Sequence, residues 1–275
     1  MPEMPHATPR LNRMRRWALV SPQALAGLRG VLTDVDDTLT ANGAIAPAAL
    51  SALGQLAAAH IPVIAITGRP AGWSEPFALQ WPVAAIVAEN GAVMLRRVGQ
   101  ALVHQYVDDL ATRRANAQRL AACAKAVVAE VPGATLARDS AGRLTDIAVD
   151  HSEYSHLDEA HIAQVVAVMR RHGLTAMVSS IHINGWIGAH SKWSGARWAV
   201  QQALGLDFDA NQWLYVGDST NDQLMFEHIP MSTGVANIDR FVDQLSVWPA
   251  FVTQGQRGDG FAEVASALLA ARVRR

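Results

Sequence analysis

An α/β fold, with a mainly parallel sheet interrupted by an inserted α+β unit, is what the 275-residue sequence predicts. Near-continuous apolar strands alternate with helical segments over residues 29–91 and again after residue 190. This pattern is typical of a parallel sheet covered on both faces. Between these stretches the strands alternate polar and apolar residues and come in pairs, as in antiparallel sheets. We therefore expect a core domain formed by 29–91 and 190–275, and an inserted domain formed by 92–189.

In the first part of the core, three segments fit buried strands: GVLTDV (30–35), IPVIAITG (61–68) and VAAIVAEN (83–90). Helical spacing over 46–60, with Pro47 near the start, predicts a helix between the first two strands. A second, short helix is expected over 69–80.

In the inserted part, helices are expected over 111–131 and 156–173. Each helix precedes a strand pair, 135–140 with 143–151 and then 175–180 with 181–189. The core pattern then returns with a helix, three strands and a last helix, expected at 192–205, 212–219, 231–236, 249–254 and from about Asp259.

The composition limits the possible partners. Half of the residues are hydrophobic and 17% are charged, which argues against disorder. A net charge of −1 gives no reason to expect nucleic acid or an anionic membrane as partner, and the apolar runs are too short to span a bilayer. The single cysteine, Cys123, excludes an internal disulfide, so we expect a cytoplasmic protein. Residues 1–28 contain several arginines and are expected to form a basic, flexible arm; the sequence indicates no oligomeric state.

Polar residues follow the apolar strands at the points where parallel α/β sheets bind ligands. They are Asp34, Asp36, Thr67, Gly68, Arg69, Asn90, Asp218, Asn221 and Asp222, with Lys192 at the start of a helix. Carboxylates crowded at one sheet edge repel each other unless a cation lies between them, and Asp oxygens suit Mg²⁺. Together, Mg²⁺, a lysine, a threonine hydroxyl and a nucleophilic aspartate fit phosphoryl transfer.

Four of these segments occur in an order that resembles the haloacid dehalogenase (HAD) superfamily of phosphatases. They are DVDDT (34–38), the threonine of AITGR (65–69), Lys192 and GDSTND (217–222). The insertion, together with AENGA (88–92), GVAN (234–237) and GDGFAEVA (258–265), resembles the type IIB, or Cof-type, cap group. That group includes sucrose-phosphate, trehalose-phosphate and mannosyl-phosphoglycerate phosphatases as well as phosphomannomutases. The resemblance implies a Rossmann-like core and an α+β cap domain over 92–189.

The resemblance also implies how the catalytic residues act. Asp34 would be the nucleophile that forms an aspartyl-phosphate, and Asp36 would protonate the leaving alcohol and then activate water. Thr67 and Lys192 would bind the phosphoryl oxygens. Members of the family mostly have glycine where this chain has Asp37. This residue either brings an extra charge near the leaving group or faces solvent.

The metal ligands follow from the same comparison. Asp34, the backbone carbonyl of Asp36, and Asp218 would hold Mg²⁺, with Asp222 as a direct ligand or just behind one. Asn221 would orient the metal or the phosphate.

Substrate selection is expected to come from the cap, because the core contacts mainly the phosphate. In SSIHINGWIGAH, strand alternation places four residues on one face as a sugar-binding surface: Ser180, His182, Asn184 and Trp186. The alternatives are an exposed sheet face or a bulged turn at the glycines of this stretch. Arg69 would reach a second anionic group, a sugar hydroxyl or a backbone carbonyl. Asn90 would support its loop or reach the substrate.

The sequence therefore predicts a Mg²⁺-dependent phosphomonoester hydrolase acting on a small phosphorylated metabolite. A sugar phosphate or glycosyl phosphate is the first expectation, and a phosphomutase of the phosphomannomutase type is the alternative. A non-catalytic binding module is disfavoured, because it would usually lack one of the residues that this chain retains: Asp34, Asp36, Thr67, Lys192, Asp218 and Asp222.

Overall fold

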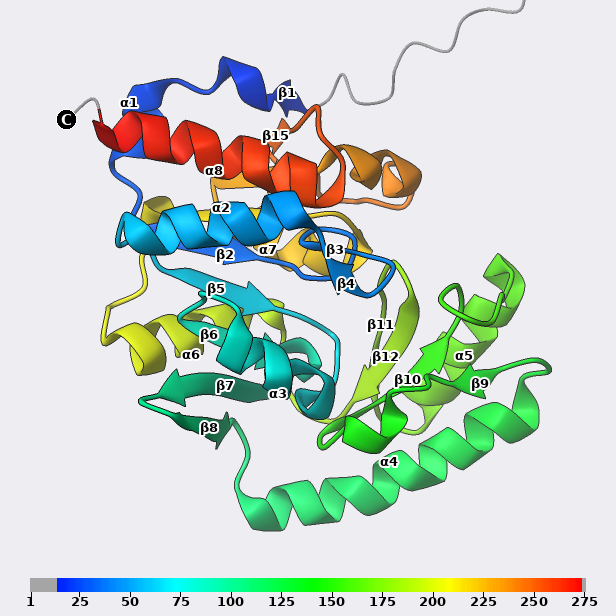
Figure 1. Cartoon of the computed structure of the whole chain (residues 1–275). Coiled ribbons are helices and arrows are strands. Elements are labelled where there is room, and N and C mark those ends of the chain that lie inside the picture. The colour runs from blue at the N-terminus through cyan, green and yellow to red at the C-terminus, as the bar shows by residue number, and fades with distance from the viewer. Residues whose placement is uncertain (1–13, 274–275) are drawn as a thin grey trace, which may run out of the picture.

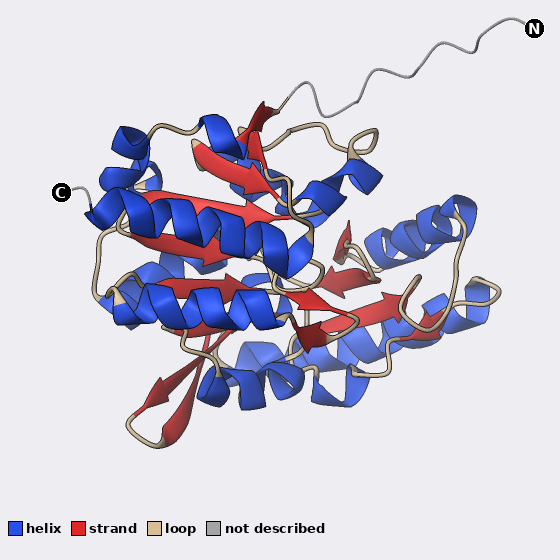
Figure 2. Ribbon diagram, turned by 45° about the horizontal axis from the view of Figure 1, so that its top comes forward, coloured by secondary structure: helices blue, strands red, loops and turns tan. Residues whose placement is uncertain are grey.

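The structure, a computed structural model, describes residues 14–273. A large sheet with helices on both faces forms the main body, and a smaller sheet with two long helices lies to one side of it (Figure 1). The same two parts are seen after a turn of the molecule (Figure 2). This arrangement confirms the α/β class expected from the sequence.

The large sheet has nine strands in the order β1-β15-β14-β13-β2-β5-β6-β7-β8. In this spatial order, the strands from β1 through β15, β14, β13, β2 and β5 to β6 run parallel to one another. The last two strands, β7 and β8, are antiparallel to their neighbours. The bounds are β1 (Arg15–Arg16), β2 (Gly30–Thr33), β5 (Val63–Ile66), β6 (Ala85–Ala88), β7 (Val93–Val98), β8 (Ala101–Tyr106), β13 (Trp213–Gly217), β14 (Met231–Gly234) and β15 (Phe251–Val252).

Helices cover both faces of this sheet because both faces are apolar. The strands β2, β5 and β6 are buried along their whole length. One face packs against α1 (Pro22–Ala26), α2 (Pro47–Ala58), α3 (Ala71–Gln80) and α8 (Arg257–Val273). The other face packs against α6 (Lys192–Leu204) and α7 (Gln223–His228). A short hairpin of β3 (Thr40–Ala41) and β4 (Ala44–Ile45) follows the loop that leaves β2.

The smaller sheet has four antiparallel strands in the order β11-β12-β10-β9. Helices α4 (Leu110–Glu130) and α5 (Glu159–Arg171) pack on one face of it through a separate apolar core. Its strands are β9 (Thr135–Leu136), β10 (Asp146–Asp150), β11 (Thr175–Val178) and β12 (His182–Trp186). The strand expected over 135–140 is shorter than predicted, because residues 139–145 turn toward the core and bind Arg69 and Glu89.

Two expected boundaries differ from the structure. The predicted arm covers 1–28, but residues 14–28 pack on the core: β1 pairs with β15, and Trp17 and Leu25 are buried. Residues 1–13 lie outside the described residues. The predicted cap began at residue 92, but β7 and β8 extend the large sheet, because their apolar residues continue its core. We therefore propose that the cap comprises residues 107–189. In the part of the chain that the structure describes, no helix is long and apolar enough to cross a membrane.

Candidate active site

The strand order creates a crevice at the carboxyl end of β2. From β2 the chain continues to β5 and β6 on one side, and only after the insertion does it return to β13 on the other side. Open α/β sheets bind ligands where the strand order reverses in this way. Asp34 follows β2, Thr67 follows β5 and Asp218 follows β13, so three of the predicted residues meet at one edge. The backbone N–H of Asp34 donates to the carbonyl of Val216 at 2.8 Å, which holds the loops after β2 and β13 side by side.

Lys192 lies between Asp34, in the loop after β2, and Asp222, in the loop after β13. Its Nζ donates to Asp34 Oδ1 at 2.5 Å, Asp222 Oδ1 at 2.7 Å and Asn221 Oδ1 at 3.2 Å. It is the first residue of α6, whose N-terminus is fixed by the Ser191 side chain. Burial lowers the pKa of Lys192, but the carboxylates of Asp222 and Asp34 outweigh this effect and keep it charged. A fixed ammonium group beside Asp34 is well suited to bind phosphoryl oxygens.

Asp222 shapes the loop after β13. Its Oδ1 accepts from the Tyr215 hydroxyl at 2.5 Å, and its Oδ2 accepts from the backbone N–H groups of Asp218 and Ser219 at 2.9 and 3.1 Å. A Cβ at Gly217 would lie 2.4 Å from Asp222 Oδ2, so only glycine leaves room for this carboxylate. With both oxygens engaged, Asp222 is better placed to support a metal ligand than to bind a metal directly.

Asp218 has a free oxygen directed into the site. Its Oδ2 accepts from Asn237 Nδ2 at 3.1 Å and Arg240 Nη2 at 3.2 Å. Its Oδ1 is buried and has no hydrogen-bond partner among the described residues. Such an orphaned carboxylate oxygen is costly unless a cation binds it.

The acidic cluster fits a divalent cation. Asp34, Asp218 and Asp222 each offer an oxygen within 4.8 Å of the others. Burial raises the pKa of Asp34 to about 8, even though Lys192 lowers it. Burial and the neighbouring carboxylate of Asp34 raise the pKa of Asp218 well above its usual range. A bound cation would remove this penalty, and an all-oxygen donor set is what Mg²⁺ prefers.

Asp36 lies two residues after Asp34, in different surroundings. Its Oδ1 accepts from Arg69 Nε at 2.9 Å, and its Oδ2 accepts from Thr67 Oγ1 at 3.4 Å. Thr67 Oγ1 also accepts from the backbone N–H of Arg69 at 2.9 Å. Asp34 therefore faces Lys192 and the acids, while Asp36 faces Arg69 and the cap.

A cap residue that sequence reasoning missed completes this group. Glu153 Oε1 accepts from Arg69 Nη2 at 2.7 Å, and Glu153 Oε2 accepts from Arg69 Nη1 at 3.2 Å and pairs with His182 Nε2 at 2.9 Å. We call Arg69, Glu153 and His182 the cap latch. Burial raises the pKa of Glu153, but hydrogen bonds from His182 and Arg69 outweigh it and lower this pKa to about 2. The Glu153 loop is itself held by Asp150, whose side chain accepts from the backbone N–H groups of residues 152–155.

Glu89, a polar residue that follows the third predicted strand, forms a second link between core and cap that was not predicted. Its buried carboxylate accepts from the N–H of Leu144 at 3.0 Å, the N–H of Thr145 at 2.6 Å and the Thr145 hydroxyl at 2.5 Å. It also accepts from the N–H of Ala71 at 3.0 Å. Since one core side chain satisfies donors of both parts, it fixes the cap over the site.

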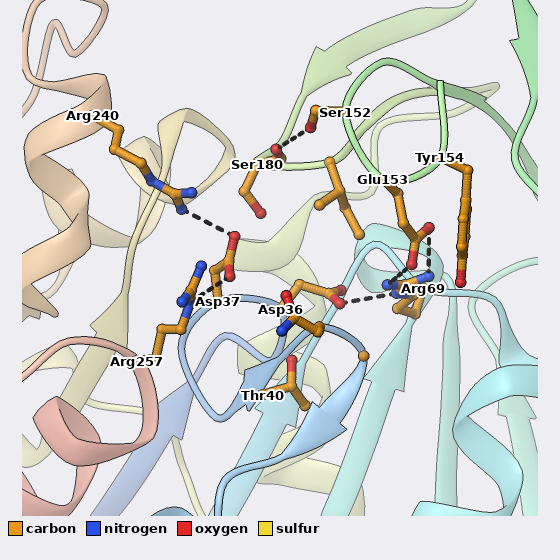
Figure 3. A pocket seen from close by; sticks show the side chains of 13 residues that line it. Asp36, Asp37, Thr40, Arg69, Ser152, Glu153, Tyr154, Ser180, Arg240 and Arg257 are labelled. Carbon is orange, nitrogen blue, oxygen red and sulfur yellow. Dashed lines mark hydrogen bonds and ion pairs between the residues drawn. The ribbon is translucent and has the colours of Figure 1, made fainter. Parts of the chain in front are cut away.

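Two cavities lie between core and cap. A cavity of about 10 Å³ lies over Asp34 and is lined by further predicted residues: Asp36, Gly68, Ser180, His182, Asn184 and Asn221. A larger cavity of about 320 Å³ adjoins Asp36, as Figure 3 shows. Arg69 and the cap residues Ser152, Glu153 and Tyr154 form part of its wall.

Two predicted substrate residues have other contacts. Trp186 is buried, stacks on His190 with ring centroids 5.7 Å apart, and donates from Nε1 to the His190 carbonyl at 3.0 Å. It is in the wall of neither cavity. Asn90 is buried with φ +55° and donates its N–H to the Thr67 carbonyl at 3.0 Å. Its role in the structure is to support the loop after β5.

Comparison with known proteins agrees with this geometry. Residues 31–124 match the family model described as haloacid dehalogenase-like hydrolase. No curated protein matches the sequence. Among solved structures, a protein from Thermoplasma acidophilum has a TM-score of 0.66 at 17% identity, covering 88% of this chain and 98% of the other. The C-terminal domain of trehalose-6-phosphate phosphatase from C. albicans has a TM-score of 0.65 at 14% identity, covering 90% and 96%. Sucrose-phosphatase from Synechocystis has a TM-score of 0.63 at 15% identity, covering 88% and 98%.

The fold and the site define an enzyme of the hydrolase class with an inserted α+β unit. Residues 31–124, which include the first two motifs, match the haloacid dehalogenase-like hydrolases, the family that the order of the motifs resembles. At these identities the solved structures establish the shared fold.

Proposed function

We propose that this protein is a Mg²⁺-dependent phosphomonoester hydrolase that acts on a small phosphorylated metabolite, with a sugar phosphate as the first candidate. The observation that carries the proposal is the contrast between Asp34 and Asp36. Asp34 is buried against Lys192 beside the free oxygen of Asp218, whereas Asp36 faces the 320 Å³ cavity. This contrast supports Asp34 as the group that attacks phosphorus and Asp36 as the group that protonates the leaving oxygen.

In the first step, an Asp34 oxygen attacks phosphorus and the bond to the leaving oxygen breaks. Asp36 gives its proton to that oxygen, so the alcohol leaves neutral. Lys192, whose Nζ lies 2.5 Å from Asp34 Oδ1, and the Thr67 hydroxyl bind the phosphoryl oxygens. The product of this step is an aspartyl-phosphate on Asp34.

In the second step, Asp36 takes a proton from a water molecule that attacks the same phosphorus. The acyl-phosphate bond breaks, phosphate leaves and Asp34 returns to its carboxylate form. Bound Mg²⁺, held by Asp34 and Asp218 with Asp222 behind them, would supply positive charge that offsets the charge on the phosphoryl oxygens. Arg69 keeps Asp36 oriented through both steps by its 2.9 Å contact.

The sucrose- and trehalose-6-phosphate phosphatases among the similar structures support a sugar phosphate as substrate class. The cavity beside Asp36 supports it as well, because its volume of about 320 Å³ is at the lower end of the range of small-molecule sites.

Phosphate release from a panel of sugar phosphates, glycosyl phosphates and phosphoglycolate, with and without Mg²⁺, tests the proposal. Asp34→Asn is expected to abolish Mg²⁺-dependent turnover, while Asp207→Asn, the same change at an exposed aspartate, is the matched control. Turnover that survives Asp34→Asn would exclude the aspartyl-phosphate route. A requirement for a bisphosphate activator, with transfer in place of release, would instead establish a mutase.

A further inference from the structure

The larger cavity contains two arginines that the proposed chemistry does not use. Arg240 and Arg257 lie on the core side of the cavity that adjoins Asp36 (Figure 3). Because Asp36 is placed to protonate the leaving group, this cavity is where the leaving group of a substrate would lie. Its walls therefore decide which leaving groups bind.

Arg69, the third arginine of the cavity, is fully engaged. Its Nε donates to Asp36, its Nη1 donates to Asp139 at 3.3 Å and Glu153 at 3.2 Å, and its Nη2 donates to Glu153 at 2.7 Å. Only 5% of its side chain is exposed. An anion could bind Arg69 only by displacing a carboxylate that already holds it, so this arginine is poorly suited to bind a second anionic group.

Arg240 and Arg257 retain N–H groups without a partner among the described residues, although Arg240 also donates from Nη2 to Asp218 Oδ2 and from Nε to the Asn237 carbonyl, each at 3.2 Å. Both bind Asp37, with Arg240 Nη2 at 3.0 Å from Oδ2 and Arg257 Nε at 2.7 Å from Oδ1. Arg257 makes no other side-chain hydrogen bond to residues 14–273, so both its Nη groups remain available. The side chains are 45% and 34% exposed, respectively. The two guanidinium groups face two carboxylates, Asp37 and Asp218, and a cation bound to Asp218 would leave this wall with a net positive charge.

The backbone holds this group in place at a conformational cost. Asp37 and Arg257 have φ of +56° and +49°, a region that non-glycine residues rarely adopt. Asn237 connects the two: its Nδ2 donates to the Asp37 carbonyl at 3.0 Å and its Oδ1 accepts from the Arg257 N–H at 2.8 Å. Strain of this kind persists where surrounding contacts fix it and is concentrated at ligand sites.

We propose that Arg257 and Arg240, oriented by Asp37, bind a second anionic group carried by the leaving group, a carboxylate or a second phosphate. The inference rests on the proposed function, because it assumes that the leaving group lies beside Asp36. It narrows the substrate class to phosphorylated acids and bisphosphates. Asp37, which stands where related proteins mostly have glycine, then acts as a positioning residue that aligns both guanidinium groups.

Matched substrate pairs test this subsite. The first pair is 3-phosphoglycerate and glycerol 3-phosphate; the first member has a carboxylate where the second has a hydroxymethyl group. The second pair is glucose 1,6-bisphosphate and glucose 6-phosphate. The ratio of kcat/KM within a pair is expected to favour the member with the second anionic group at least tenfold in at least one pair. Arg257→Gln is expected to bring that ratio close to one, Arg257→Lys to restore part of it, and Arg29→Gln, at an exposed arginine outside the cavity, to leave it as in the wild type.

The outcomes separate this inference from the proposed function. A preference in the first pair alone identifies a carboxylate, and a preference in the second alone identifies a phosphate. Turnover of the panel with no preference in either pair, or a preference that Arg257→Gln leaves intact, overturns the subsite while the hydrolase stands. If no substrate is turned over, the hydrolase fails, and calorimetric binding of both pairs to the Asp34→Asn protein with Mg²⁺ decides the subsite by the same ratios.

Discussion

Glu153→Gln tests whether the cap latch holds the cap over the site. The substitution keeps the size of the side chain and one acceptor oxygen but removes the charge that binds Arg69 and His182. Hydrogen bonds to charged groups contribute about 1.5–3 kcal/mol each, and the 16% exposure of Glu153 weakens them somewhat. Since Gln retains one bond, the expected cost to the closed arrangement is about 2 kcal/mol.

If the closed arrangement is the form that binds substrate, a cost of this size corresponds to a decrease of roughly 30-fold in kcat/KM. The assay is steady-state hydrolysis of the best substrate of the panel, with thermal unfolding measured in parallel. The matched control is Glu159→Gln, the same change at an exposed glutamate of the cap. If Glu153→Gln stayed within threefold of Glu159→Gln at equal stability, the latch would have no part in activity.

Three further predictions concern charge. Asp34→Asn is expected to stabilise the metal-free protein by about 1–3 kcal/mol at pH 8. The pKa of Asp34 is raised to about 8, so its contribution to stability is present below about pH 4 and is lost as the pH rises toward 8. The unfolding temperatures of the wild type and of Asp34→Asn should therefore diverge between pH 4 and pH 8, and a constant difference over this range would contradict the prediction. Asp218→Asn is expected to weaken the Mg²⁺ response of activity by about 10–100-fold, measured by metal titration, because its free oxygen is the proposed ligand. Glu153 has its pKa lowered to about 2, so the stability it contributes is full above about pH 4.5 and is lost as the pH falls toward 2; acid unfolding curves of wild type and Glu153→Gln should therefore converge there, and a constant offset would refute the assignment.

The residues that the sequence revealed share one property: they directly follow apolar strands. Asp34, Thr67 and Asp218 could be placed at one edge because parallel strands end at the same edge and the chain supplies a recognisable strand before each. Lys192 was found through the order of the motifs, since a lysine at a helix start carries no signal of its own.

The residues that the sequence did not reveal act across long separations. Glu153 binds a partner 84 positions away and Arg257 one 220 positions away. Glu89 follows a predicted strand, but its partner Thr145, 56 positions away, was not predicted. An acid in a loop or an arginine before a helix has no periodicity that would indicate its partner. The strands β7 and β8 were not predicted, and their residues were assigned to the inserted unit, because the sequence of a strand pair does not indicate which sheet the pair joins.

The neighbours of β2 have a consequence for synthesis of the chain. Strand β2 pairs on one side with β5, which is made soon after it, and on the other side with β13, whose first residue is Trp213. At 5–20 residues per second, β2 waits roughly 10–40 s for its second neighbour. In that interval the whole cap is made, with an apolar core of its own. The cap can thus fold first on the ribosome, and the edge of β2 stays open until the last quarter of the chain emerges.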